Sequence, residues 1–286
     1  MAQIIHTSTG ASNTGAAVDV NILTLPGISS LDSLFEIDSG VVLDGDGLGV
    51  TWYNKAPSWG SGWAEYMRGT RTLLDTEAPL AGYPTLDFPK YSYQTYSQML
   101  VPTGKYLLSN AGYSPSPEKR KHTLCAVFKN SRSANFPYVL SGVSGYGYTP
   151  GYFSLMGIQW DNHLNRITIM TRSSYHSGYK ILALPYPSWY NETDWTIFIW
   201  NYDMASGDSI VYLNGIKIFD GYFSTAMSIS SPAFPQPAGI GLDGNYGGSN
   251  FVGKYAAVAC WNYNLEADED FFLNTTNYFA TKYGIT

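Results

Sequence analysis

The chain has 286 residues, of which 44% are hydrophobic, so it can bury a substantial core and is not an intrinsically disordered protein. Only 13% are charged and the net charge is −6, which excludes the basic surface that duplex nucleic acid requires. Aromatic residues reach 16%, and glycine (29) and proline (15) are frequent. Few charges, many aromatic side chains and frequent turn residues indicate an all-β protein rather than a helical bundle.

The beginning of the chain is small and polar, and we expect residues 1–24 to form an arm or linker before one domain over residues 25–286. This segment lacks the basic start and apolar stretch of a signal peptide, and the chain has no apolar run long enough to span a membrane. We therefore expect folding in a cytosol and no membrane insertion. We also expect the arm to dock the domain onto a larger particle or to join symmetric copies in a homo-oligomer, a trimer rather than a dimer, with a monomer as the alternative.

Residues 22–108 show an irregular pattern in which short apolar runs are interrupted by Pro and Gly. Beyond this segment the strand signals become regular, and Ile167, Ile169 and Thr171 share one face of a period-two pattern. The predicted strands are residues 123–129, 138–141, 153–159, 166–171, 195–202, 209–213, 216–219, 239–242 and 251–261.

Two local signals are specific. Asn214-Gly215 stands between two β-rich runs and predicts a hairpin with a type I′ turn, because both central residues of that turn need a positive φ. The end of the chain carries the helical pattern, with an acidic start at residues 266–270, Lys282 in the last turn and Gly284 placed to end the helix. The residues expected to cover an apolar sheet surface are Phe272, Phe279 and Tyr283. Many strands with one short C-terminal helix predict an antiparallel β-sandwich of jelly-roll type.

The two cysteines, Cys125 and Cys260, each lie in an apolar, strand-like run. Buried free thiols are expected from a protein that folds in a cytosol. A disulfide stays open as an alternative if the two strands are neighbours.

An ordered set of motifs runs through about residues 120–284. Its members are a Trp-led strand at 194–198, a Tyr-Leu-Asn-Gly hairpin at 212–215, Gly-Ile-Gly at 239–241, a long last strand with an Asn-Tyr-Asn-Leu turn at 251–265, and a Lys-Tyr-Gly helix end at 277–284. The set resembles the laminin-G-like branch of the concanavalin A-like lectin/glucanase superfamily. The first part of the chain is similar in layout to the opening segment of laminin-G-like proteins in bacteriophage virions.

This resemblance implies a non-catalytic virion protein: a head or tail decoration, a fibre or a receptor-binding component, made in the host cytoplasm. Its partners would be other virion proteins and host surface glycans. Because the superfamily also contains glucanases and lyases, a glycan-degrading enzyme on the same fold is the alternative, and a purely structural capsid or tail subunit is a third.

The sequence provides little for catalysis. The Glu-x-Asp-x-x-Glu pattern of the superfamily's glucanases does not occur. Glu192 and Asp194 fit a solvated turn before a strand better than a carboxylate pair. The four histidines are widely separated, which does not indicate a zinc site or a Ser-His-Asp triad. We therefore expect no catalytic residues.

Aromatic side chains in loops are the candidates for ligand binding, because their rings offer an apolar face and a polar edge to sugars and proteins. The alternative is that these rings pack on their own sandwich or on a symmetry mate. The candidates are Trp52, Trp59, Trp63, Tyr175, Tyr179, Trp189 and Tyr190.

Calcium is the cofactor that the resemblance suggests, because related sandwiches bind it through Asp and Asn oxygens on loops at one rim. The candidate ligands are Asp161, Asp243 and Asn245. Ordinary turn chemistry explains the same residues without a metal, so both interpretations stay open.

Overall fold

The structure is a computed structural model. It describes residues 21–43, 49–56, 66–70, 72–89, 98–100, 121–131, 138–141, 156–161, 164–172, 179–203, 206–223, 239–240, 251–262, 265 and 267–285. The predicted arm, residues 1–24, lies almost wholly outside these ranges, so the domain boundary stays a prediction.

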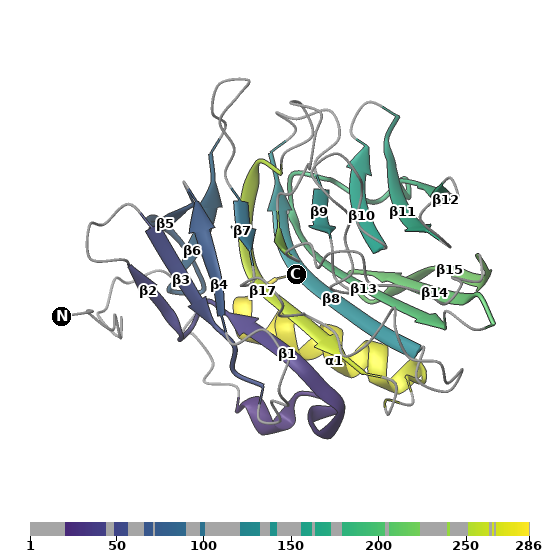
Figure 1. The fold of residues 1–286 in the computed structure, drawn as a ribbon, viewed down its shortest axis with the longest axis horizontal. Coiled ribbons are helices and arrows are strands. Elements are labelled where there is room, and N and C mark those ends of the chain that lie inside the picture. Colours follow the sequence, from purple (N-terminus) through teal and green to yellow (C-terminus); the bar gives the residue numbers. More distant parts are fainter. Residues whose placement is uncertain are drawn as a thin grey trace, which may run out of the picture.

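Two sheets pack face to face as a β-sandwich (Figure 1), and every described strand pair is antiparallel. The first sheet has the order β15 (Ile216–Tyr222), β14 (Asp208–Leu213), β13 (Trp195–Asp203), β8 (Lys121–Asn130), β17 (Gly253–Trp261), β6 (Tyr83–Phe88) and β5 (Leu73–Leu80), and β1 (Leu31–Glu36) also pairs with β17. The second sheet has the order β12 (Tyr179–Pro185), β11 (Arg166–Arg172), β10 (Met156–Asp161), β9 (Tyr138–Ser141), β16 (Gly239–Ile240), β7 (Gln98–Leu100), β4 (Tyr66–Thr70), β3 (Gly49–Tyr53) and β2 (Val41–Leu43).

The remaining elements are two short 3₁₀ helices, η1 (Ile22–Thr24) and η2 (Ile28–Ser30), and the helix α1 (Glu269–Tyr283). The predicted antiparallel sandwich with one C-terminal helix is therefore confirmed. In the described part of the chain, no helix is long and apolar enough to cross a membrane.

The strands predicted after residue 120 are all present with bounds close to those expected. The sequence pattern missed β12 and did not resolve the strands of the first 100 residues. Some of these missed strands are short, such as β2 and β7, and β12 lies at a sheet edge where Ile181 is 57% exposed, whereas β1 is buried along its whole length. Strands that are very short, exposed on both faces or buried on both faces do not show the alternation of apolar and polar residues by which strands are predicted from sequence.

The hairpin between β14 and β15 has the predicted turn, with φ values of 48° at Asn214 and 79° at Gly215. The turn is fixed to the neighbouring strand, because the Asn214 side chain accepts a hydrogen bond of 2.7 Å from the backbone N–H of Ile197.

We expect Gly215→Ala to lower the free energy of unfolding by about 1 kcal/mol, because alanine tolerates a positive φ poorly. Its new Cβ would also lie 3.3 Å from the Cγ2 atom of Thr276 on α1. Urea unfolding of the variant measures the loss. A variant as stable as the wild type would show that the turn does not require glycine.

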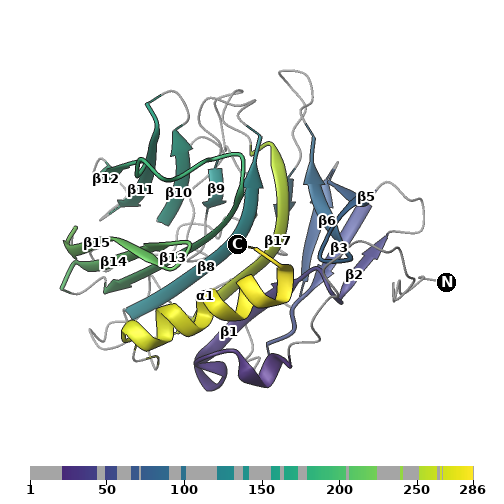
Figure 2. The ribbon, with the colours of Figure 1, turned by 180° about the vertical axis from the view of Figure 1, so that it is seen from behind.

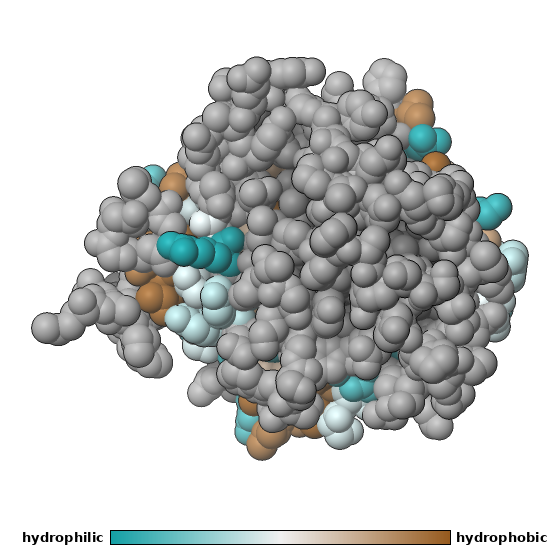
Figure 3. All heavy atoms as spheres, viewed as in Figure 1, coloured by the Kyte–Doolittle hydropathy of each residue, from teal (hydrophilic) through white to brown (hydrophobic). Residues whose placement is uncertain are grey.

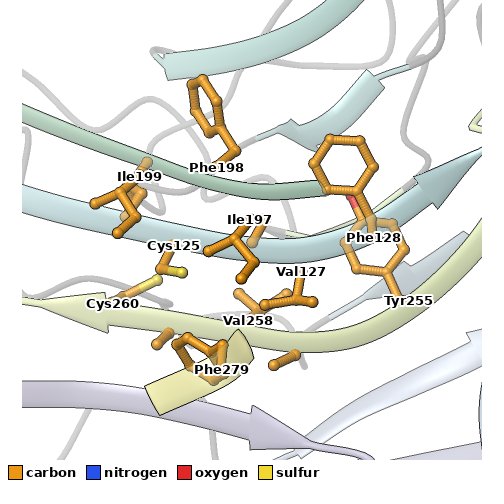
Figure 4. Packing of buried hydrophobic residues seen from close by; sticks show 14 of the residues in the cluster. Cys125, Val127, Phe128, Ile197, Phe198, Ile199, Tyr255, Val258, Cys260 and Phe279 are labelled. Carbon is orange, nitrogen blue, oxygen red and sulfur yellow. The ribbon is translucent and has the colours of Figure 1, made fainter. Parts of the chain in front are cut away.

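Aromatic side chains fill the space between the sheets. Phe128 of β8 packs edge-on against Trp160 of β10 in the opposite sheet, with ring centroids 4.8 Å apart. Phe198 of β13 contacts the same indole at 5.3 Å, and Tyr255 of β17 stacks on Phe128 at 5.7 Å. Figure 4 shows Phe128, Phe198 and Tyr255 on the strands of the first sheet. These rings join the two sheets into one hydrophobic core.

The helix α1 lies across the outer face of the first sheet (Figure 2). Phe272 and Phe279 are buried, and Phe272 stacks on Tyr212 of β14 with centroids 4.5 Å apart. The ends of the helix are as predicted, because Asp268 caps the N-terminus by accepting from the Phe271 N–H and Gly284 adopts the left-handed conformation.

Cys125 and Cys260 lie on the adjacent strands β8 and β17, and both are buried free thiols. The disulfide left open above is not formed. Burial raises the pKa of both thiols, which makes them unreactive side chains of the core.

A buried group of charges also holds the helix. Lys282 of α1 lies 2.8 Å from one carboxylate oxygen of Glu36 on β1 and 3.0 Å from Asp38. Lys55, which follows β3, binds the other Glu36 oxygen at 2.7 Å and Asp38 at 2.8 Å, and the Tyr278 hydroxyl donates to Glu36 at 3.0 Å. The two carboxylates and two ammonium groups balance each other and connect β1, the segment after β3 and α1.

Candidate ligand-binding surface

The structure removes one residue from the predicted aromatic surface. Trp52 lies on β3 with its side chain fully buried, and its ring packs against Phe35 of the opposite sheet at 5.5 Å. Its indole N–H donates a 2.9 Å hydrogen bond to the backbone oxygen of Glu36. The prediction that Trp52 contacts a ligand is therefore corrected: this tryptophan is a core residue with no face available to a ligand.

Several other predicted residues lie outside the described part of the chain. For Tyr179 on β12 and Asp161 at the end of β10 only the backbone is described. The residues wholly outside the described ranges are Trp59, Trp63, Tyr175, Asp243 and Asn245. Among the described residues no three His, Cys, Asp or Glu side chains are grouped as a metal site requires, and calcium binding stays a prediction.

Trp189 and Tyr190 lie in the connection from β12 to β13, residues 186–194, which we call the Trp189 loop. It consists of two consecutive turns, in which the N–H of Tyr190 bonds to Pro187 O at 2.9 Å and that of Asp194 bonds to Asn191 O at 3.0 Å. The second turn is typical of asparagine at the first position, because the Asn191 side chain accepts from the Thr193 backbone at 3.3 Å. Hydrogen bonds between residues of the loop itself therefore define its conformation.

The loop is also fixed to the body of the sandwich. The N–H of Tyr186 donates to the backbone oxygen of Asn165, in the turn between β10 and β11, at 2.8 Å. The hydroxyl of Tyr190 accepts a 3.0 Å hydrogen bond from the indole N–H of Trp160 and shares one of 2.8 Å with the hydroxyl of Thr196. Tyr190 is therefore a half-buried anchor whose hydroxyl is engaged within the protein, and its contact with a ligand stays a prediction.

The electrostatics agree with this role for Tyr190. Burial raises its pKa to about 12, against the smaller opposing effect of the hydrogen bonds from Thr196 and Trp160. The negative charge of Asp194 raises it further. The phenol therefore stays neutral at physiological pH and keeps both hydrogen bonds.

Trp189 is the exposed aromatic residue of the loop, with 46% of its surface accessible. Its ring meets Tyr190 edge-on, at 6.2 Å and an interplanar angle of 89°. Tyr190 in turn contacts Tyr186 at 5.2 Å and Trp160 at 6.4 Å, and Trp160 packs on Phe128. A continuous series of ring contacts thus runs from the core to the exposed indole of Trp189.

The surroundings of the loop combine apolar and polar groups. Leu164, next to the residue that binds Tyr186, is 51% exposed, and Figure 3 shows hydrophobic side chains at the surface in the region of β11 and β12. Ser188, Asn191 and Asp194 are exposed, whereas Glu192 is only 3% exposed. Such a surface can bind the apolar face of a sugar or a small apolar patch of a protein, with polar groups at the rim to fix the orientation.

Sequence reasoning missed the residues that position this surface. Trp160 and Thr196 lie on strands β10 and β13, and Leu164 lies in a turn, so nothing in the local sequence relates them to Trp189. One feature of the sequence could have predicted an ordered loop here. The turn sequence Asn191-Glu192-Thr193-Asp194 stands directly before a Trp-led strand.

Comparison with known proteins relates this chain to others through its fold. No protein-family model and no curated protein matches it. The binding domain of botulinum neurotoxin DC, in complex with rat synaptotagmin II, is similar with a TM-score of 0.55 and 11% identity over 87% of this chain and 52% of that one. Botulinum neurotoxin type C, which interacts with two ganglioside molecules, gives 0.56, with 8% identity over 87% and 51%.

A Trypanosoma rangeli sialidase in complex with sialic acid gives a TM-score of 0.52 and 12% identity, over 90% of this chain and 33% of the sialidase. The chain thus spans about half the length of the neurotoxin structures and a third of the sialidase. At such low identities the likeness concerns the fold alone, an antiparallel β-sandwich.

Proposed function

We propose that this chain is a non-catalytic binding module that recognises cell-surface glycans through the Trp189 loop. The observation that carries the proposal is the exposed indole of Trp189, which packs edge-on against Tyr190, a residue that Trp160 of the core binds through a hydrogen bond. Support also comes from structures of similar fold, which include a neurotoxin that interacts with gangliosides and a sialidase that holds sialic acid.

A fixed indole suits a sugar for a physical reason. The C–H groups on one face of a hexose form an apolar patch, which an aromatic ring covers while the hydroxyl groups stay in water or meet polar side chains. Because the loop is already ordered, binding does not have to immobilise it, and less of the interaction free energy is lost to ordering. The exposed Ser188 and Asn191 lie beside Trp189 in the sequence and can supply the hydrogen bonds.

We expect Trp189→Ala to weaken glycan binding at least tenfold, as removal of a central aromatic contact commonly does. Binding is measured on a glycan array and then by titration with the best glycan found. Stability should change little, because about half of the side chain is exposed.

Tyr222→Ala is the matched control, since Tyr222 is also an exposed aromatic residue (66%) but lies on β15 of the first sheet. Equal losses in the two variants, or no loss in either, would contradict a site at Trp189.

The non-catalytic part of the proposal is supported by the positions of the two carboxylates in the loop. Glu192 is almost completely buried whereas Asp194 is exposed, so only one of the two is accessible to a glycan, and a glycosidase uses both carboxylates of its pair. Assays for reducing sugars and for unsaturated uronates on the glycans that bind should detect no turnover. Turnover that Glu192→Gln or Asp194→Asn abolishes would favour the glycan-degrading enzyme instead.

We further propose that the module acts in a bacteriophage virion, made in the host cytoplasm and attached to other virion proteins as a homo-oligomer. This setting rests on the resemblance to laminin-G-like virion proteins, and several copies would increase the avidity of weak single sites. Analytical ultracentrifugation of the full chain, with and without residues 1–20, measures the assembly. A monomer in both cases would contradict the oligomer. Assembly without glycan binding would favour the purely structural subunit.

A further inference from the structure

The buried group of charges at α1 holds an amine in contact with two carboxyl groups. The Lys282 Nζ atom lies 2.8 Å from Glu36 Oε1 and 3.0 Å from Asp38 Oδ2. The side chains of Lys282 and Glu36 are 2% and 0% exposed. The rings of Tyr278 and Tyr283 flank the Nζ atom, with centroids 5.4 and 6.0 Å away. An amine and a carboxyl group are the reactants of an amide bond, and this site holds them together away from bulk water.

We propose that Lys282 and Asp38 condense to an isopeptide bond, an amide that joins the two side chains, with the loss of one water molecule. Glu36 acts as the base, and Lys55 binds the oxygen that becomes negative during the reaction. No oxidant, cofactor or further substrate is needed. The ion pairs described above are those of the chain before this reaction.

The three protons of the Lys282 ammonium group account for the whole reaction. The first passes to Asp38 Oδ2, 3.0 Å away, which leaves a free amine and a neutral carboxyl group. The amine nitrogen then bonds to Asp38 Cγ while Glu36 Oε1, at 2.8 Å, takes the second proton. Glu36 returns this proton to Oδ2, and the Cγ–Oδ2 bond breaks to release water. The third proton stays on the amide nitrogen.

Lys55 is placed to assist at the other oxygen of Asp38. Its Nζ atom lies 2.8 Å from Asp38 Oδ1 and 2.7 Å from Glu36 Oε2. Burial lowers the pKa of Lys55, but Glu36 and Asp38 together raise it above 10.5, so this amine stays charged. An ammonium group fixed at Oδ1 stabilises the negative charge that develops there when the amine attacks Cγ. Lys282 is thus the nucleophile, and Lys55 stabilises the transition state.

The contacts of Glu36 suit it to the role of base. The Tyr278 hydroxyl donates to Oε1 at 3.0 Å, in addition to the ammonium groups of Lys282 and Lys55. Hydrogen bonds to a carboxylate stabilise its ionised form. Oε1 would have to leave if Lys282 bonded to Glu36, and this third donor holds it in place.

The buried position also favours the amide over the separate groups. Hydrolysis of an amide in water is favourable because the ammonium and carboxylate products are hydrated, whereas here both products lose much of that hydration. Burial raises the pKa of Asp38, but Lys55 and Lys282 lower it below 3.8, so its carboxyl group is ionised before the reaction and takes its proton from Lys282. After condensation, Glu36 and Lys55 remain as one balanced ion pair. In the linked chain Asp38 no longer titrates, so its effect on stability in acid belongs to the unlinked chain.

The mass of the denatured full-length chain tests the proposal, because a covalent bond survives denaturation and an ion pair does not. The wild type should be one water molecule lighter than its sequence. Trypsin should release residues 1–55 and 255–286 as one linked peptide, since Lys55 is the first cleavage site and an acylated Lys282 is not cleaved. Fragmentation of this peptide should place the link between Asp38 and Lys282.

Two variants and an internal control accompany this measurement. Lys282→Arg keeps the positive charge but cannot form the amide, so it should have its full sequence mass. Glu36→Gln removes the base and should slow the linkage about a hundredfold in freshly synthesised protein. Lys254 and Asp75 also form an ion pair, but their side chains are 25% and 19% exposed, so they should stay unlinked.

A wild-type chain of full sequence mass would overturn the inference. A loss of water with residues 1–55 and 255–286 released as separate peptides would also overturn it, because this result indicates a succinimide within one segment. A link that fragmentation places at Lys55 or at Glu36 would contradict the assigned roles. None of these results bears on glycan binding, since the Trp189 loop contains none of these residues.

Discussion

Replacing Lys282 with methionine should lower the free energy of unfolding by about 3 kcal/mol or more, the usual result of removing one partner from a buried ion pair. The Lys282 ammonium group is 2% exposed and the Glu36 carboxylate is fully buried. Without Lys282, the carboxylates of Glu36 and Asp38 keep a single ammonium group, that of Lys55, and one negative charge is left uncompensated in the interior. Chemical unfolding measured for the wild type and the variant gives the difference.

Lys217→Met is the control for this prediction. Lys217 forms its 3.1 Å ion pair with Asp220 on the surface, where both side chains are exposed, so its loss should leave the unfolding free energy essentially unchanged. If Lys282→Met behaves like Lys217→Met, the buried charges do not hold the helix α1 to the sheet.

Acid should destabilise the fold through His122. This side chain is fully buried at the start of β8, and within the described part of the chain neither ring nitrogen has a hydrogen-bond partner. Burial lowers its pKa from 6.5 to about 3, against the opposing attraction of Asp203. Between these two values the unfolded chain carries a proton that the folded chain does not, so the folded state loses stability as the pH falls from about 6.5 towards 3. Each pH unit in this window costs about 1.4 kcal/mol, which amounts to about 3 kcal/mol at pH 4.

The His122→Leu variant isolates this effect, because leucine is of similar size and does not titrate. Its unfolding free energy should change much less than that of the wild type between pH 7 and pH 4. Below pH 4 both proteins should lose further stability, since Lys55 and Lys282 outweigh burial and hold the pKa of Asp38 below 3.8 in the folded state. If the unfolding free energies of the wild type and the variant depend on pH in the same way above pH 4, the pKa of His122 is not lowered in the folded protein.

The parts of the fold that sequence could predict are those set by neighbouring residues. The Asn214-Gly215 turn, the Asp268 cap and the Gly284 terminus each follow from the conformational preference of one or two residues, and all are present. The long strands β8, β13 and β17 are continuous apolar runs because the core covers one face and α1 covers part of the other. Such signals depend little on the rest of the chain.

The parts that could not be predicted depend on contacts between distant segments. Glu36 and Lys282 are charged residues far apart in the sequence, and they become a buried pair because the topology brings β1 and α1 together. Trp52 reads as an exposed loop aromatic, yet the facing sheet supplies Phe35 to cover it.

The same argument applies to the candidate site. Trp189 and Tyr190 are adjacent and chemically alike, and the sequence predicts both of them equally as ligand-binding residues. Trp160, 30 residues earlier, binds the Tyr190 hydroxyl by a hydrogen bond, so Tyr190 is the half-buried anchor and Trp189 the more exposed residue. The loop could be predicted from its turn residues, but the division between anchor and contact residue required the packing of β10 against β13.

A crystal structure of the protein with the glycan that binds most tightly on the array tests the central claim most directly. The account predicts one sugar ring lying on the free face of the Trp189 indole, with its hydroxyl groups within hydrogen-bond distance of Ser188 or Asn191. The ring contacts from Trp189 to Trp160 should be unchanged from those of the free protein. A glycan bound at another surface, with the Trp189 indole uncovered, would contradict the account.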